Sequence, residues 1–217
     1  MHSPAPQPTY RLIPSRFPPI GLFDTVATAA DLESVMELAG WTNDRLIRER
    51  VARLPQEEWV FGRANASIIM AAFLHAAPGG GRFNGPELGA WYASAAVATA
   101  IAEVGHHLRR EALARGLEGM TRTFRAYSAR LEGTYVDIRG SEAALYAPDD
   151  YAPGQAYGER LRADSEDGLV YDSVRHRGGT NACAYRPSNV LEVVQTDHFE
   201  IVVTVPDKHV EATRLKG

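Results

Sequence analysis

The sequence predicts a single α+β domain, with mixed short-stranded sheets and one long central helix. The longest helical pattern runs from Ser94 to about Arg115, where apolar residues recur at helical spacing: Val97, Ala100, Ile101, Val104 and Leu108. Short β-prone runs, separated by glycine and proline, follow this stretch. No dinucleotide or P-loop glycine motif follows a strand, so a doubly wound nucleotide fold is not predicted.

The composition is that of an ordinary globular protein. The 217 residues are 45% hydrophobic and 23% charged, and the net charge of −4 gives no general attraction to nucleic acid. The single cysteine, Cys183, rules out an intrachain disulfide and fits a reducing compartment. No apolar run reaches the roughly eighteen residues of a membrane span, and no signal-like segment is visible, so we expect the cytoplasm.

The N-terminal third is predicted to contain an arm, a strand and a helical insert. Proline-rich residues 1–9 read as a flexible arm before a domain at 10–210. Residues 10–13 (YRLI) form a candidate strand, and Phe17 and Phe23 are expected to anchor the next loop by burial. Two helices, from Thr28 to Gly40 and from Asn43 to just before Pro55, give an insert at about 28–54.

The middle of the chain combines glycines, an arginine and a strand. Residues 64–77 suit a buried helix or a strand pair, and 90–93 (AWYA) read as a short strand with Ser94 as the helix N-cap. Gly79 to Gly81 allow the backbone to approach a ligand closely, and they lead directly into Arg82. A guanidinium fork at such a loop favours an anion site.

The second half predicts several strands. Within residues 121–140, Phe124 and Ala126 alternate with Arg125 and Tyr127, which indicates two antiparallel strands with one wet face. Residues 155–163 read as a helix, and further strands are predicted at 169–173, 181–185 and 198–205, followed by a charged tail.

Glu103 interrupts the small and apolar face of the long helix. It lies nearly in line with Ala96, Thr99 and Ala100, so it borders the buried stripe. Periodicity leaves two interpretations open, an exposed flanking carboxylate or one that faces a cleft. The adjacent His106 and His107 point about 100° apart and match no metal-ligand spacing, so no metal is expected.

An ordered set of motifs resembles the RES domain family. The blocks are GGRFN, AWYAS, AIAEV, YDSVR and GGTNACAY, and the resemblance runs from about Tyr10 to Tyr185. It implies a fold similar to ADP-ribosyltransferases and the activity of a toxin, from a bacterial toxin-antitoxin pair, that consumes NAD+ as its substrate. It also implies an Xre-like helix-turn-helix antitoxin as partner and leaves open a homo-oligomer or a complex with that antitoxin.

The resemblance assigns catalytic roles to Glu103, Arg82 and Ser173. A carboxylate near the ribose would stabilise the positive charge that develops when the bond to nicotinamide breaks, and arginines would hold the pyrophosphate. No G-x-S-x-G motif surrounds Ser173, so it is not expected to be a covalent nucleophile.

For NAD+ binding the resemblance implies Arg11, Tyr92 and Asn181, together with Arg82 and Ser173. The acceptor stays open among phosphate, water and a protein side chain, and the alternatives are a mono-ADP-ribosyltransferase and a non-catalytic interaction module. Two features depart from the family pattern: Asp172 stands where proline commonly precedes the motif serine, and the segment between Phe17 and Pro78 is long.

Overall fold

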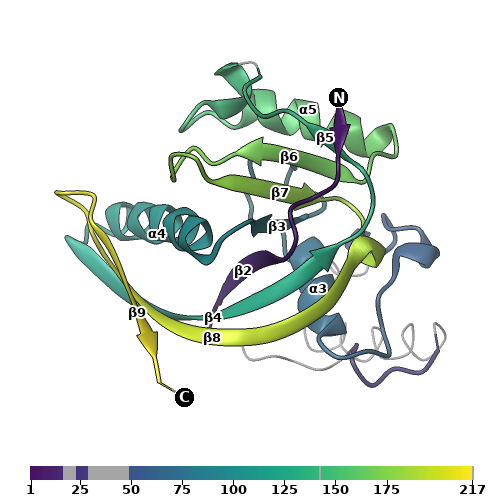
Figure 1. Cartoon of the computed structure of the whole chain (residues 1–217), viewed down its shortest axis with the longest axis horizontal. Coiled ribbons are helices and arrows are strands. Elements are labelled where there is room, and N and C mark those ends of the chain that lie inside the picture. The colour runs from purple at the N-terminus through teal and green to yellow at the C-terminus, as the bar shows by residue number, and fades with distance from the viewer. Residues whose placement is uncertain (17–22, 29–48, 142, 217) are drawn as a thin grey trace.

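A strongly curved mixed sheet organises the computed structural model, which describes residues 1–16, 23–28, 49–141 and 143–216 (Figure 1). Its nine described strands lie in the order β1-β5-β6-β7-β3-β2-β4-β8-β9. All neighbours pair antiparallel except β5 and β6. The strands are β1 His2–Ser3, β2 Thr9–Pro14, β3 Trp91–Ser94, β4 Gly119–Leu131, β5 Tyr135–Asp137, β6 Gly168–Asp172, β7 Thr180–Ala184, β8 Val190–Thr204 and β9 Val210–Leu215. The predicted α+β class with a mixed sheet is confirmed.

Three α-helices and three short 3-10 helices complete the described elements. They are α3 Ala66–Leu74, α4 Val97–Ala114, α5 Ala152–Ala163, η1 Gln56–Glu58, η2 Ala143–Tyr146 and η3 Pro187–Asn189. The 18-residue α4 is the long helix that the sequence predicts, and it lies within the curve of the sheet (Figure 1). None of the described helices is both long and apolar enough to cross a bilayer.

The two faces of the sheet carry separate hydrophobic clusters. Helix α3 packs with Trp91, Ala93 and Tyr127 on one face. On the other face α4 packs on the alternate positions of β2 and β4, Leu12 and Ala126 among them. A third cluster joins α5 to β6 and β7. Because both faces are covered, the sheet holds a buried core on each side.

Several expectations for the strands need correction. Strands β4 and β5 do not pair with each other; β4 lies between β2 and β8, whereas β5 lies between β1 and β6. The predicted wet face of β4 is wrong, since Arg125 is only 8% exposed and Tyr127 1%. The α3 cluster covers that face, which a two-residue alternation cannot reveal. The charged tail forms β9, paired with β8.

The N-terminal residues lie against the sheet. His2 and Ser3 form β1 beside β5, and Ala5 is buried, so residues 1–9 are packed where the sequence suggested a loose arm. Of the predicted helical insert, residues 28–54 fall mostly outside the described residues; within it, residues 49–51 are helical. Phe17 lies outside the described residues, and Phe23 is buried as expected. The domain boundaries stay a prediction.

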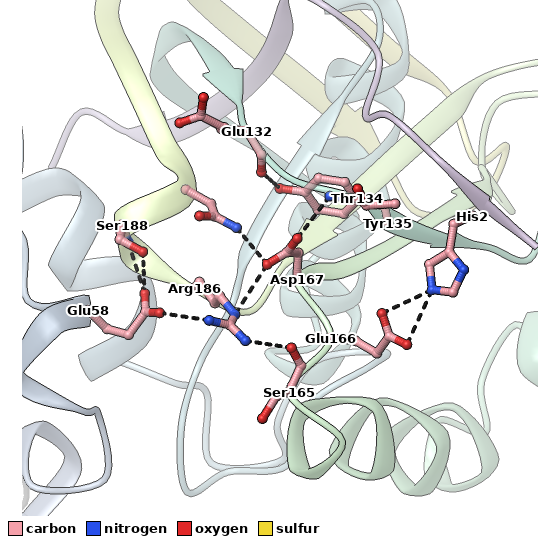
Figure 2. Close-up of polar contacts among 11 residues, drawn as sticks. His2, Glu58, Glu132, Thr134, Tyr135, Ser165, Glu166, Asp167, Arg186 and Ser188 are labelled. Carbon is pink, nitrogen blue, oxygen red and sulfur yellow. Dashed lines mark hydrogen bonds and ion pairs between the residues drawn. The ribbon is translucent and has the colours of Figure 1, made fainter.

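An ion-pair network joins η1 to the far end of the β6–β7 hairpin (Figure 2). Arg186 lies between two carboxylates, with Nη1 3.3 Å from Glu58 and Nε 3.2 Å from Asp167. Ser188 donates its hydroxyl to the same Glu58 carboxylate. Asp167 also accepts a hydrogen bond from the Thr134 backbone, at 2.8 Å. This network, called the Arg186 network below, connects four chain segments through one guanidinium and two carboxylates.

Candidate active site

A cavity of about 260 Å³ lies between α4, β2, β3, β7 and the glycine loop. Five residues that the sequence analysis singled out line it: Arg11, Arg82, Tyr92, Glu103 and Asn181. They come from β2, the loop before β3, β3 itself, α4 and β7. The cavity therefore gathers a carboxylate, two guanidinium groups, a tyrosine ring and an amide from positions up to 170 residues apart, from Arg11 to Asn181.

The Glu103 carboxylate is held by two neutral donors. Its Oε1 accepts a hydrogen bond from the Ser173 hydroxyl and another from the Asn181 amide, each 2.7 Å long. The Asn181 oxygen in turn accepts from the Ser94 hydroxyl at 2.6 Å, which fixes the orientation of the amide. No salt bridge to Glu103 forms among the described residues. The two hydrogen bonds thus fix Oε1 of Glu103 without neutralising the negative charge of the carboxylate.

Ser94 has a different role from the one predicted. Strand β3 continues through Ser94, which pairs with both Tyr10 and Asn181, and α4 begins only at Val97. The N-cap position is Ala96, with no side-chain cap hydrogen bond. The expectation of a Ser94 cap is wrong because the strand ladder extends further than the sequence pattern indicates, and the hydroxyl orients Asn181 instead.

The Ser173 hydroxyl is fully engaged. It donates its single hydrogen to Glu103 and accepts hydrogen bonds from the backbone N–H groups of Arg175 and His176, at 3.1 and 2.9 Å. A hydroxyl offers one donor and two lone pairs, so this arrangement uses its whole capacity. Ser173 is not among the residues that line the cavity. Its hydroxyl binds Glu103, which does line it, and links that carboxylate to the loop after β6.

Arg11 carries its charge in a partly buried position on the cavity wall. Strands β2 and β3 pair only at Tyr10 and Ser94, and beside that pair Arg11 Nη1 donates 3.0 Å to the Tyr92 carbonyl. The guanidinium lies 4.9 Å from the Trp91 ring centroid, and its buried Nε has no hydrogen-bond partner among the described residues. Burial lowers the pKa of Arg11 to about 10, so it remains a cation at neutral pH. An anion in the cavity would offset this desolvation.

Arg82 lines the cavity and also holds one of its walls. It is 9% exposed, and its Nη1 donates to the carbonyls of Leu145 and Ala147, at 3.3 and 2.7 Å. Its guanidinium stands 4.6 Å from the centroid of the Tyr151 ring, another lining residue. In the described chain these contacts use one of its three nitrogens for hydrogen bonds, so the fork retains donors for a ligand.

Tyr92 presents its ring to the cavity while its hydroxyl supports the glycine loop. The hydroxyl donates to the Asn84 side chain at 2.7 Å and accepts from the Phe83 backbone at 2.9 Å. Burial raises the pKa of Tyr92 well above its usual range. A Cβ on Gly81 would lie 2.6 Å from this hydroxyl, and Gly80 has φ +71°, so the loop requires glycine at both positions.

Three further residues line the cavity although no sequence pattern indicated them as site residues: His107, Tyr151 and Tyr171. His107 follows Glu103 by four residues, and this i, i+4 spacing on one helix was a signal that could have found it. The two tyrosines come from the loop before α5 and from β6, and nothing in their local sequence indicates a shared cavity.

Asp172, the departure before the motif serine, has a structural partner. Its Oδ2 accepts a 2.8 Å hydrogen bond from the Gly140 backbone, so the carboxylate ties β6 to the loop after β5. Among the described residues no cluster of three or more histidine, cysteine or acidic side chains is arranged to hold a metal ion.

The sheet and the cavity define an α+β domain that places one carboxylate and two arginines on a single concave site. The chain belongs to the RES domain family, whose model matches residues 50–204. Arg82, Tyr92, Glu103, Ser173 and Asn181 lie within the matched residues, and Arg11 precedes them.

One solved structure to which the chain is similar is the crystal structure of the M. tuberculosis MbcT-MbcA toxin-antitoxin complex. A chain of that structure is 16% identical, with a TM-score of 0.45 and coverage of 90% of this chain and 86% of the other. No curated protein sequence matches the chain significantly.

Proposed function

We propose that this protein cleaves the glycosidic bond between nicotinamide and ribose in NAD+. The observation that carries the proposal is the Glu103 carboxylate, which is fixed by Ser173 and Asn181 on a cavity that Arg11 and Arg82 also line. A carboxylate fixed before the substrate arrives stabilises a developing positive charge without reorganisation. Membership of the RES domain family supports this assignment.

The chemistry needs a negative charge more than it needs a proton. As the C1′–N bond breaks, the electron pair moves to the pyridine nitrogen and nicotinamide leaves as a neutral molecule. Positive charge then develops on the ribose, as in glycosidases. Glu103 is the group proposed to stabilise that charge, with one oxygen held by its two donors and the other free of hydrogen bonds within the described chain.

The remaining residues of the site are proposed to bind NAD+ or to position Glu103. Arg11 and Arg82 are proposed to neutralise the pyrophosphate, because their guanidinium groups form charge-assisted hydrogen bonds with phosphate oxygens. Tyr92 is proposed to stack its ring on the nicotinamide or the ribose, since its hydroxyl is occupied. Ser173 and Asn181 are assigned to positioning Glu103. Ser173 is not assigned as a nucleophile because its hydroxyl has no remaining capacity.

The biological role that we propose is that of a cytoplasmic toxin that depletes NAD+ and is neutralised by an Xre-like helix-turn-helix antitoxin. The support is membership of the RES domain family, together with the toxin-antitoxin role that the motif resemblance implies. Expression in a bacterial host should arrest growth, and co-expression of a helix-turn-helix regulator encoded beside the gene should restore it. Arrest that persists in both Glu103→Ala and Arg82→Ala would separate toxicity from this cavity.

Nicotinamide release by the purified protein tests the activity directly. The protein is incubated with NAD+, with and without inorganic phosphate, and nicotinamide and the ADP-ribose product are separated by chromatography. A phosphorylated product indicates phosphorolysis, free ADP-ribose indicates hydrolysis, and label on protein indicates transfer. Absence of release from well-folded protein would reject the proposal and favour a non-catalytic interaction module.

A further inference from the structure

His107 shares the cavity with Glu103. The two residues are four apart on α4, so their side chains leave the same face of the helix one turn apart. Both line the cavity, and the His107 side chain is accessible to solvent. Within the described chain no hydrogen bond occupies its ring nitrogens, unlike His176, whose ring contacts Thr99 Oγ1 at 2.8 Å.

Charged groups from three elements surround this imidazole. Glu103 and Arg110 come from α4, Arg175 from the loop after β6, and Arg82 from the loop before β3. Desolvation lowers the pKa of His107 and the three arginines lower it further, whereas Glu103 opposes them. The imidazole is therefore neutral at pH 7 and has a lone pair available.

Other polar groups of the cavity are already committed. Glu103 uses Oε1 for two hydrogen bonds, and its charge is needed at the ribose. The hydroxyls of Ser173 and Tyr92 both donate to other side chains. Arg11 and Arg82 are cations and cannot accept a proton. A neutral imidazole with a free nitrogen is thus the group on this cavity best able to take one.

We propose that His107 is the general base of the reaction, an inference that rests on the proposed cleavage of NAD+. An oxygen of the acceptor, water or hydrogen phosphate, bonds to C1′ of the ribose while the C1′–N bond breaks and its electron pair goes to nicotinamide. The proton of the acceptor O–H moves to the free ring nitrogen of His107 and then to solvent. Glu103 stabilises the ribose and His107 activates the acceptor.

The test compares His107→Gln with the unmodified protein. Glutamine keeps a polar side chain but cannot accept a proton in this pH range. The kcat for nicotinamide release should fall about 10²-fold to 10³-fold, within the range for general bases, and KM should change less than about threefold. Release is measured from pH 5 to pH 9, with and without inorganic phosphate, after thermal unfolding has shown that the variant is folded.

The pH profile distinguishes a base from a merely structural histidine. In the unmodified protein kcat should fall on acidification with an apparent pKa below 6.5, where the imidazole becomes protonated. This limb should disappear in His107→Gln, and added imidazole should partly restore kcat in His107→Ala. His209→Gln is the control, since His209 is exposed in the turn before β9 and should leave kcat and the profile unchanged.

The outcomes separate the two proposals. If the unmodified protein releases no nicotinamide, the proposed function is overturned and this inference with it. If that protein is active and His107→Gln keeps its kcat and its acid limb, only the role of His107 is overturned. A rise in KM without a fall in kcat would also contradict it, because the residue would then contribute to binding rather than to proton transfer.

Discussion

Two carboxylates of this protein, Glu58 and Glu103, are held in opposite ways. Glu58 is 7% exposed and lies in the Arg186 network, where a guanidinium and the Ser188 hydroxyl satisfy it (Figure 2). Glu103 is held by a neutral hydroxyl and a neutral amide, and its charge has no ion-pair partner in the described chain. The negative charge of Glu58 is paired with a guanidinium, whereas the negative charge of Glu103 is left unpaired by the described residues.

The same hairpin supports both carboxylates. Asp167 and Arg186 flank the end of β6 and β7 nearest η1, whereas Ser173 and Asn181 lie at or beside the opposite end. In a buried ion pair, the mutual attraction of the two charges offsets part of the desolvation penalty of each. A carboxylate that stabilises positive charge on a bound substrate is more effective when no arginine or lysine of the protein already neutralises it. The difference is consistent with a structural role for Glu58 and with the catalytic role that we propose for Glu103.

Removing the charge of Glu103 should produce the largest effect. Glu103→Gln retains an oxygen that can accept from Ser173 and Asn181 but carries no charge. The rate of nicotinamide release should fall about 10²-fold to 10³-fold, equivalent to about 3–4 kcal/mol of barrier, with the free energy of unfolding changed by less than about 1 kcal/mol. Glu118→Gln, at an exposed position, is the matched control. An unchanged rate of nicotinamide release in Glu103→Gln would show that the charge of Glu103 is not needed for the reaction.

Breaking the Arg186 network should act on stability instead. Arg186→Met leaves the buried Glu58 with Ser188 alone, and we expect the free energy of unfolding to fall by about 2 kcal/mol, a value reduced because the guanidinium is 36% exposed. Urea unfolding measures this loss, and nicotinamide release per folded molecule should stay within twofold. Arg53→Met, which breaks an exposed pair with Glu87, should cost less than about 0.5 kcal/mol.

Two serines give a matched pair of smaller changes. Ser173→Ala removes the hydroxyl that donates to Glu103, and Ser188→Ala removes the one that donates to Glu58. Each should lower the free energy of unfolding by about 1 kcal/mol. Only Ser173→Ala should slow nicotinamide release, by about tenfold, because the carboxylate of Glu103, which we propose to be catalytic, loses its orientation. Equal rates for the two variants would contradict the positioning role of Ser173.

Another paired carboxylate, Asp137 with Arg139, should make stability depend on pH. Its hydrogen bond and ion pair with Arg139 lower its pKa from 3.8 to about 2. This stabilisation is present above the unfolded pKa of 3.8 and is lost as the pH falls towards 2. The stability difference between the unmodified protein and Asp137→Asn should shrink by about 1 kcal/mol between pH 5 and pH 3 in urea unfolding. A constant difference would show that the pair does not stabilise the fold.

The sequence predicted local elements well wherever one pattern dominated. The apolar stripe that includes Val97 and Leu108 gave α4, and the short runs after Gly168 and before Tyr185 gave β6 and β7. It failed where a distant element changed the environment. Tyr127 is buried because α3, more than fifty residues earlier, covers that face of β4.

The sequence by itself determined the α+β class, the long helix with Glu103 on its small-residue face, and the arginine behind the glycine loop, because these depend on spacing within a few turns or strands. Only the tertiary structure decided that Glu103 faces a cavity, that Ser173 and Asn181 hold it, and that His107 stands beside it. Those contacts join β6, β7 and α4 across about seventy residues, and they form only when the sheet brings the strand ends to the helix.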